Sequence, residues 1–188
     1  MRYLNFLLLA AVLSSLQGCF PIVAAGLGAG ALMGADRRTT GIYLEDSRIE
    51  AKSAREISVR FKDTAHISVT SFNRHVLLTG EVASESDKAE VAQIVSSIQN
   101  VSGVSNELVV GKLSSLGSRS NDALITSNVK LRFLNNKTFQ PDHVKVVAED
   151  GTVFLMGLVK RMEAEAATDI ASNSKGVQQV VTVFEYLD

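Results

Sequence analysis

The strongest constraint on this chain is an internal repeat, which divides most of its length into two copies of one unit. The segments His66–Val82 and His143–Val159 are identical at six of 17 positions, at a constant offset of 77 residues. Gly103-Val104 is matched by Gly176-Val177, with the second copy four residues shorter. Such self-similarity marks a repeated structural unit. A fold predicted for one copy must therefore also suit the other.

The first copy combines helix and strand signals in a fixed order. Ser47 and Glu50 have the spacing of a capping box, and Ser84 precedes a second run with helical periodicity. The predicted elements of this copy are a helix at 47–62, strands at 67–71 and 76–82 joined by Asn73-Arg74, a helix after Ser84, and a strand at 104–110.

The second copy repeats this order. Asp150-Gly151 is a strong hairpin signal between its first two strands. The predicted elements of this copy are a helix at 121–136, strands at 143–148 and 152–159, a helix at 162–174, and a strand at 177–186.

The pattern α-β-β-α-β, written twice, predicts an α+β protein with two tandem domains. Each domain would hold a three-stranded mixed sheet covered on one face by two helices. The other face must then be polar or be covered by the partner domain. We place the first domain at 46–113, a Gly/Ser-rich linker at 114–120, and the second domain at 121–188.

The chain begins with the features of a secretory signal peptide. Arg2 is followed by an apolar stretch from Leu4 to Leu16. The run Leu16-Gln17-Gly18-Cys19 resembles a bacterial lipobox, in which the cysteine thiol carries a diacylglycerol. On this resemblance, residues 1–18 are a lipoprotein signal peptide and 19–45 a lipidated tether. The alternative is an N-terminal membrane helix with an incidental cysteine.

The segment after the cysteine is an uncharged run of 16 residues, 20–35. It is shorter than the ~20 residues that a membrane-spanning helix needs, which favours a small-residue tether near the bilayer surface. Gly26, Gly30 and Gly34 nevertheless have the GxxxG spacing of helix packing in membranes. In bacterial lipoproteins an aspartate as second mature residue signals retention in the inner membrane. By resemblance to these sorting rules, Phe20 at that position implies transport to the outer membrane.

The repeated unit resembles a BON domain. The residues that carry the resemblance are Val76–Val82 with Gly103-Val104, and Val153–Val159 with Gly176-Val177. Two such units behind a lipobox, with Asp36–Gly41 between, resemble the dual-BON outer-membrane lipoproteins. The resemblance implies a non-enzymatic protein without cofactors, anchored in the outer membrane and facing the periplasm. It also implies binding of anionic phospholipid through the first helix of the second domain, and a role in outer-membrane integrity, including at the division site.

The helix predicted at 121–136 has two apolar stripes. Ile125, Val129 and Phe133 lie on one side, and Leu124 and Leu131 lie on another. Basic residues flank the second stripe, an arrangement that suits a membrane interface. The candidate phospholipid-binding residues are Leu124, Ile125, Asn128, Val129, Lys130, Arg132 and Leu134. Alternatively, Leu124 and Leu131 pack against the other domain.

A rival lipid-facing surface lies on the first predicted helix. It is a basic stripe made of Arg48, Lys52, Arg55 and Lys62. Such a stripe is more often a solvated face balanced by nearby acids, here Glu50 and Glu56.

The sequence offers little sign of catalysis or of other ligands. The three histidines, His66, His75 and His143, form no cluster with Cys19, so we expect no catalytic and no metal site. The 19 basic residues are balanced by 20 acidic ones, which argues against a nucleic-acid partner. We expect no small-molecule substrate. The expected partners are an anionic phospholipid membrane and, alternatively, other envelope proteins for which the chain serves as an adaptor.

Overall fold

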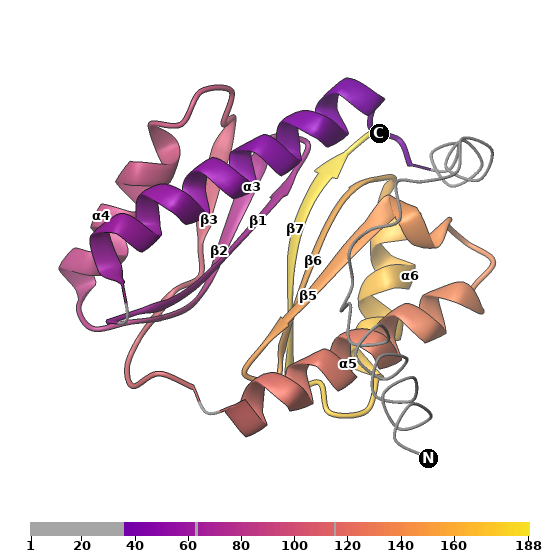
Figure 1. Cartoon of the computed structure of the whole chain (residues 1–188). Coiled ribbons are helices and arrows are strands. Elements are labelled where there is room, and N and C mark those ends of the chain that lie inside the picture. Colours follow the sequence, from indigo (N-terminus) through magenta and orange to yellow (C-terminus); the bar gives the residue numbers. More distant parts are fainter. Residues whose placement is uncertain (1–35, 63, 115) are drawn as a thin grey trace, which may run out of the picture. The chain divides into compact units, whose positions relative to one another are not determined.

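The computed structural model describes residues 36–62, 64–114 and 116–188. The predicted signal peptide, Cys19 and the segment 20–35 lie outside these ranges. The α+β fold with two tandem copies is confirmed (Figure 1). None of the helices within the described ranges is long and apolar enough to cross a membrane.

The first copy comprises two helices and three short strands around a central strand, β2. In chain order, they are α3 (Thr40–Phe61), β1 (His66–Phe72), β2 (His75–Val82), α4 (Glu85–Ser96), β3 (Gly103–Asn106) and β4 (Val109–Val110). Strand β2 pairs antiparallel with β1 and parallel with β3 and β4. The strand predicted at 104–110 is split because Leu108 turns into the core, where it is 1% exposed.

The second copy repeats this topology. It contains α5 (Leu116–Leu134), the short 3-10 helix η1 (Pro141–His143), β5 (Val144–Glu149), β6 (Thr152–Val159), α6 (Arg161–Ser172) and β7 (Gln179–Tyr186). Strand β6 pairs antiparallel with β5 and parallel with β7. Helix α5 begins within the segment predicted to be a linker.

Helix α3 begins at Thr40, not at Ser47 as the capping box predicted. The Thr39 hydroxyl caps the helix by accepting a hydrogen bond from the Ile42 amide. Ser47 and Glu50 instead lie inside the helix. The Glu50 carboxylate accepts hydrogen bonds from the Ser71 amide and from Lys145 of the second domain, each at 2.8 Å. The predicted cap at Ser84 is confirmed, since its hydroxyl accepts from the Asp87 amide.

A buried aspartate on the first helix of each copy holds the β-hairpin turn. Asp46 accepts hydrogen bonds from the amides of Asn73 and Arg74, at 2.9 and 2.7 Å. Asp122 accepts from the amides of Asp150 and Gly151, each at 3.0 Å. The turn residues have positive φ angles, as the tight turn between two antiparallel strands requires.

The glycine of the repeated Gly-x-Val motif has a steric role in both copies. A Cβ atom on Gly80 would collide with the carbonyl oxygen of His66, and one on Gly157 would collide with that of His143. Gly80 also has a φ of +111°. The motif therefore marks a close approach between the first two strands of each sheet.

The sheets pack against each other through the faces that the helices leave uncovered. Phe72 and Leu77 of the first copy meet Phe154, Met156 and Leu158 of the second in one buried cluster. Successive side chains of a strand point to opposite faces of the sheet. Val76 and Leu78 face the helices of their own domain, and Leu77 faces the partner. The open sheet face is thus covered by the partner domain, which was one of the two possibilities left by the sequence.

The segment Asp36–Arg38 contacts both copies. The Arg37 guanidinium donates to both carboxylate oxygens of Glu163, at 2.6 and 2.8 Å, and to the carbonyl oxygen of Leu158 at 2.7 Å. Arg38 pairs with Asp46 at 2.8 Å and lies 4.0 Å from the ring centre of Phe72. This segment thus ties the start of the fold to each domain.

Because Leu77 is fully buried between the two sheets, we predict that Leu77→Ala destabilises the protein by about 2–5 kcal/mol. Urea unfolding of the fragment 36–188 measures this loss. Val59→Ala, at a position 69% exposed, is the control and should change stability by less than about 0.5 kcal/mol. Equal effects of the two substitutions would contradict the buried interface.

Candidate lipid-binding surface

The second apolar stripe of α5 is exposed. Leu124 is 64% exposed, Leu131 58% and Leu134 65%. The alternative that Leu124 and Leu131 pack against the other domain is therefore wrong. The physical reason is that the two sheets face each other, so α5 lies on the outer side of its sheet.

The first stripe of α5 forms the inner face of the helix. Ile125, Val129 and Phe133 are each no more than 1% exposed and belong to the core of the second domain. Two of the candidate lipid-binding residues, Ile125 and Val129, thus lie in the core and offer no surface to a ligand. They fix the rotation of α5 about its axis and so direct Leu124 and Leu131 outward.

The polar candidates surround the exposed leucines. Asn128 lies between Leu124 and Leu131 on the helical stripe and is exposed, as is Lys130. Arg132 is exposed, but its guanidinium donates to the carbonyl oxygen of Ile170 at 3.0 Å and to the Ser174 hydroxyl at 3.1 Å. Arg132 therefore also holds α5 against the end of α6.

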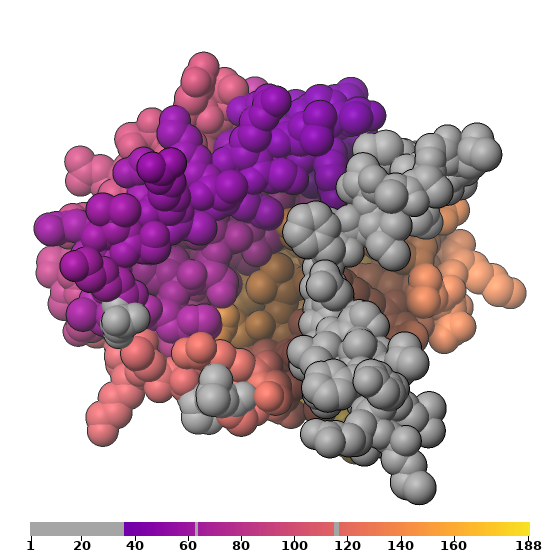
Figure 2. All heavy atoms as spheres, in the orientation of Figure 1, coloured from indigo at the N-terminus to yellow at the C-terminus, as the bar shows by residue number. Residues whose placement is uncertain are grey.

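The rival basic stripe is exposed along α3, which lies on the face shown in Figure 2. Its members are Arg48, Lys52, Arg55 and Lys62. The Arg48 guanidinium is 3.4 Å from Glu45, whose carboxylate also accepts from Asn100. Val59 lies on the same side of the helix, with 69% of its surface exposed. The stripe differs from the α5 surface in having one apolar side chain among four cations.

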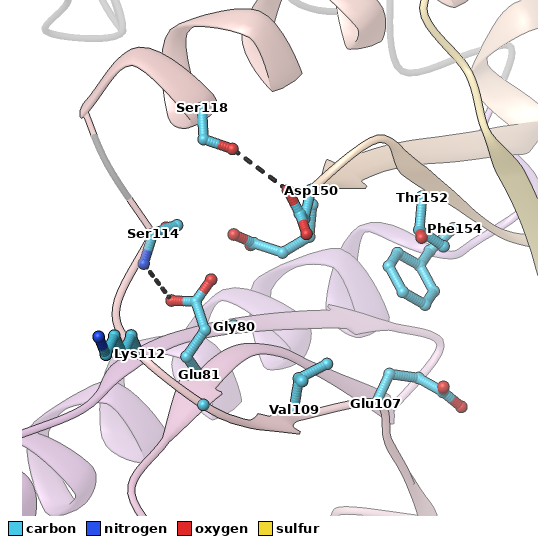
Figure 3. Close-up of a pocket in the computed structure, with 12 residues that line it drawn as sticks. Gly80, Glu81, Glu107, Val109, Lys112, Ser114, Ser118, Asp150, Thr152 and Phe154 are labelled. Atoms are coloured by element: carbon cyan, nitrogen blue, oxygen red, sulfur yellow. Dashed lines mark hydrogen bonds between the residues drawn. The ribbon is translucent and has the colours of Figure 1, made fainter.

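A hollow of about 380 Å³ lies between the end of β2, the strands β5 and β6, and the start of α5 (Figure 3). Four carboxylates line it, those of Glu81, Glu107, Glu149 and Asp150, with a single lysine, Lys112. Glu81 accepts a hydrogen bond from the Ser114 amide at 3.2 Å. A lining of this charge would repel an anionic headgroup, so the hollow is no part of a phospholipid site.

The histidines and carboxylates of the described ranges form no group of three or more that could hold a metal ion. His66 and His143, which are equivalent in the repeat, each lie 3.9 Å from a glutamate, Glu149 and Glu163 respectively. Hydrogen bonds from Arg37 outweigh the effect of burial and lower the pKa of Glu163. Glu163 thus belongs to a contact that holds the fold.

Sequence reasoning missed the two turn-capping aspartates and the tie made by Asp36–Arg38. Asp46 and Asp122 carry one signal that could have found them, since each precedes a buried apolar residue of its helix by three positions, Ile49 and Ile125. That spacing puts an acidic side chain on the inner face. Arg37 and its partner Glu163 are 126 positions apart. No local sequence pattern indicates such a contact.

The fold and the repeated Gly-x-Val sites define a protein built from two BON domains, and the BON domain family model matches residues 45–112 and 121–188. The chain belongs to this family and is a dual-BON protein of the DolP type. It is 36% identical to Outer membrane lipoprotein DolP of Haemophilus influenzae over 175 residues, covering 92% of this chain and 91% of the relative.

Two further relatives match over most of their length. The chain is 31% identical to the 21 kDa hemolysin of Actinobacillus pleuropneumoniae, covering 81% of this chain and 79% of that protein. It is 30% identical to Osmotically-inducible protein Y of Escherichia coli, covering 81% and 78%.

We predict that Glu149→Gln stabilises the fold at about pH 7 and not at about pH 4. Burial raises the pKa of the Glu149 carboxyl, and the charges of Glu81 and Asp122 raise it further. Stability is therefore lost as pH rises from the unfolded pKa through the folded one. Thermal unfolding at both pH values measures the difference. Glu107→Gln, at an exposed carboxylate of the same hollow, is the control. A gain at pH 4 equal to that at pH 7 would contradict the assignment.

Proposed function

We propose that the chain is an outer-membrane lipoprotein that binds anionic phospholipid through the exposed face of α5. The observation that carries the proposal is the exposure of Leu124 and Leu131 on a helix whose other face is fully packed. Exposed apolar side chains beside Lys130 gain by entering the boundary between headgroups and acyl chains. A nearby cation adds about 1 kcal/mol of attraction to an anionic leaflet.

The relatives support the envelope part of this proposal. The relative from Haemophilus influenzae is named an outer membrane lipoprotein and spans nearly the whole of this chain. The lipobox at Cys19 gives this chain a matching anchor. Maintenance of outer-membrane integrity, including at the division site, and the absence of enzymatic activity follow from the family resemblance and stay predictions.

We predict that Leu131→Glu weakens binding of the fragment 36–188 to vesicles that contain phosphatidylglycerol by tenfold or more. Burying one leucine is worth about 1.5–3 kcal/mol, and about 1.4 kcal/mol corresponds to a factor of ten. Vesicle co-sedimentation measures the affinity. Val59→Glu, on the outward side of α3, is the matched control and should leave binding unchanged.

The same assay separates the alternatives. Loss of binding in Lys52→Glu, with Leu131→Glu unaffected, would move the site to the basic stripe of α3. The adaptor role in envelope assembly would be favoured by two results together. Lipid composition would change the vesicle binding of none of the variants, and a defined protein would be captured through α5.

The anchor is tested separately through Cys19. We expect Cys19→Ser to abolish lipid attachment and to leave an unprocessed precursor or a soluble product, because the thiol is the group that carries the diacylglycerol. Fractionation of the envelope followed by mass spectrometry of the mature N-terminus checks this. Full recovery of Cys19→Ser in the outer membrane would contradict lipid anchoring.

A further inference from the structure

A second exposed apolar surface surrounds the point where the chain joins the fold. We call it the junction patch and define it by side chains that are 46–68% exposed. They come from the start of α3, the start of α6 and the end of β7. Its members are Tyr43, Leu44, Met162, Tyr186 and Leu187.

Side-chain and backbone contacts connect these positions to Asp36–Arg38. The Arg38 guanidinium lies 5.2 Å from the ring centre of Tyr43. Arg37 binds Glu163, the residue after Met162, at 2.6 Å. The Leu187 amide donates a hydrogen bond to the Val159 carbonyl at 3.0 Å. The preceding carbonyl, that of Leu158, accepts a hydrogen bond from Arg37. The junction patch thus lies around Asp36–Arg38, where the chain enters the fold.

The chemistry of the junction patch suits the boundary between water and lipid. Tyrosine has an apolar ring and a polar tip, and it is enriched where membrane meets water. Arg161 lies 4.9 Å from the ring centre of Tyr186, and Lys160 precedes it with an exposed side chain. The neighbouring carboxylate of Glu163 is bound by Arg37, which reduces the repulsion of an anionic surface.

The other copy of the repeat shows that the fold does not require these residues. After the central strand β2, the chain continues as Ala83-Ser84-Glu85-Ser86, and after β6 as Lys160-Arg161-Met162-Glu163. Both segments begin a helix against the same kind of sheet. The first copy uses small and acidic residues there, so packing does not explain an exposed methionine next to two cations in the second.

We propose that the junction patch rests on the anionic lipid surface to which the chain is anchored. This inference rests on the proposed function, because it takes Cys19 as the anchor. Asp36 follows Cys19 by 17 residues, so the patch surrounds the described residues nearest to the anchor along the chain. A short link gives this end a high effective concentration at the bilayer, where a few apolar side chains then suffice for contact.

A single tryptophan tests the proposal, since the chain has none of its own. Met162→Trp and Leu187→Trp are made in the full lipidated protein and incorporated into vesicles of phosphatidylglycerol and phosphatidylcholine with brominated acyl chains. We expect quenching of about twofold at both positions on contact with the acyl region. Val59→Trp is the control. It is exposed on α3 and lies about 28 Å along the helix from Thr40, and it should show no quenching.

Leu131→Trp, read in parallel, separates this inference from the proposed function. Quenching at position 131 without quenching at 162 and 187 would overturn the junction contact and leave the α5 site standing. Quenching at 162 and 187 alone would support the junction contact and remove the α5 site. A concentration-dependent blue shift at 162 without quenching would show a protein on the patch and overturn the proposal. All four positions are exposed, and an unchanged thermal midpoint verifies that each variant is folded.

Discussion

The packing of the two sheets against each other is the contact on which the rest of the structure depends. Each BON domain has helices on only one face of its sheet, so each has an apolar face that it cannot cover alone. The apolar face of the first domain presents Phe72 and Leu77, and that of the second presents Phe154, Met156 and Leu158. These two faces bury each other. Domains of this size bury only a modest core, and the shared cluster makes them one unit.

This packing also decides which surfaces are available for binding. Because the sheets occupy the inside, the helices α3, α4, α5 and α6 lie on the outside. Leu124 and Leu131 could not be buried between the domains in such an arrangement. Polar contacts at the margin of the interface, such as Lys145 with Glu50 at 2.8 Å, keep the domains in one orientation and so keep the outward faces of α3 and α5 fixed.

The two copies agree where the fold needs them to and differ where it does not. The turn-capping aspartates Asp46 and Asp122, and the glycines Gly80 and Gly157, have the same role in both copies. The outward face of the first helix is basic in one copy and carries leucines in the other. The fold therefore does not require either character on this face of the helix.

The repeat and the strand periodicity were enough to predict the fold class and the order of elements. They failed at the start of α3, because Ser47 and Glu50 have the spacing of a cap while Glu50 is used for a contact with Lys145 across the interface. They also left Ile125 and Val129 of the inner stripe among the candidate binding residues, beside Leu124. Only the packing of Ile125 and Val129 against the sheet separates the inner stripe from the exposed one.

Hydroxyl-radical footprinting of the lipidated protein determines whether α5 presents its leucines to an anionic membrane. This method reads the solvent access of individual side chains without substitutions. Membrane contact by α5 predicts slower modification of Leu124 and Leu131 on vesicles with phosphatidylglycerol than on vesicles of phosphatidylcholine alone, with Val59 and Val109 unchanged. Unchanged modification of both leucines on anionic vesicles, or protection confined to α3, would contradict it.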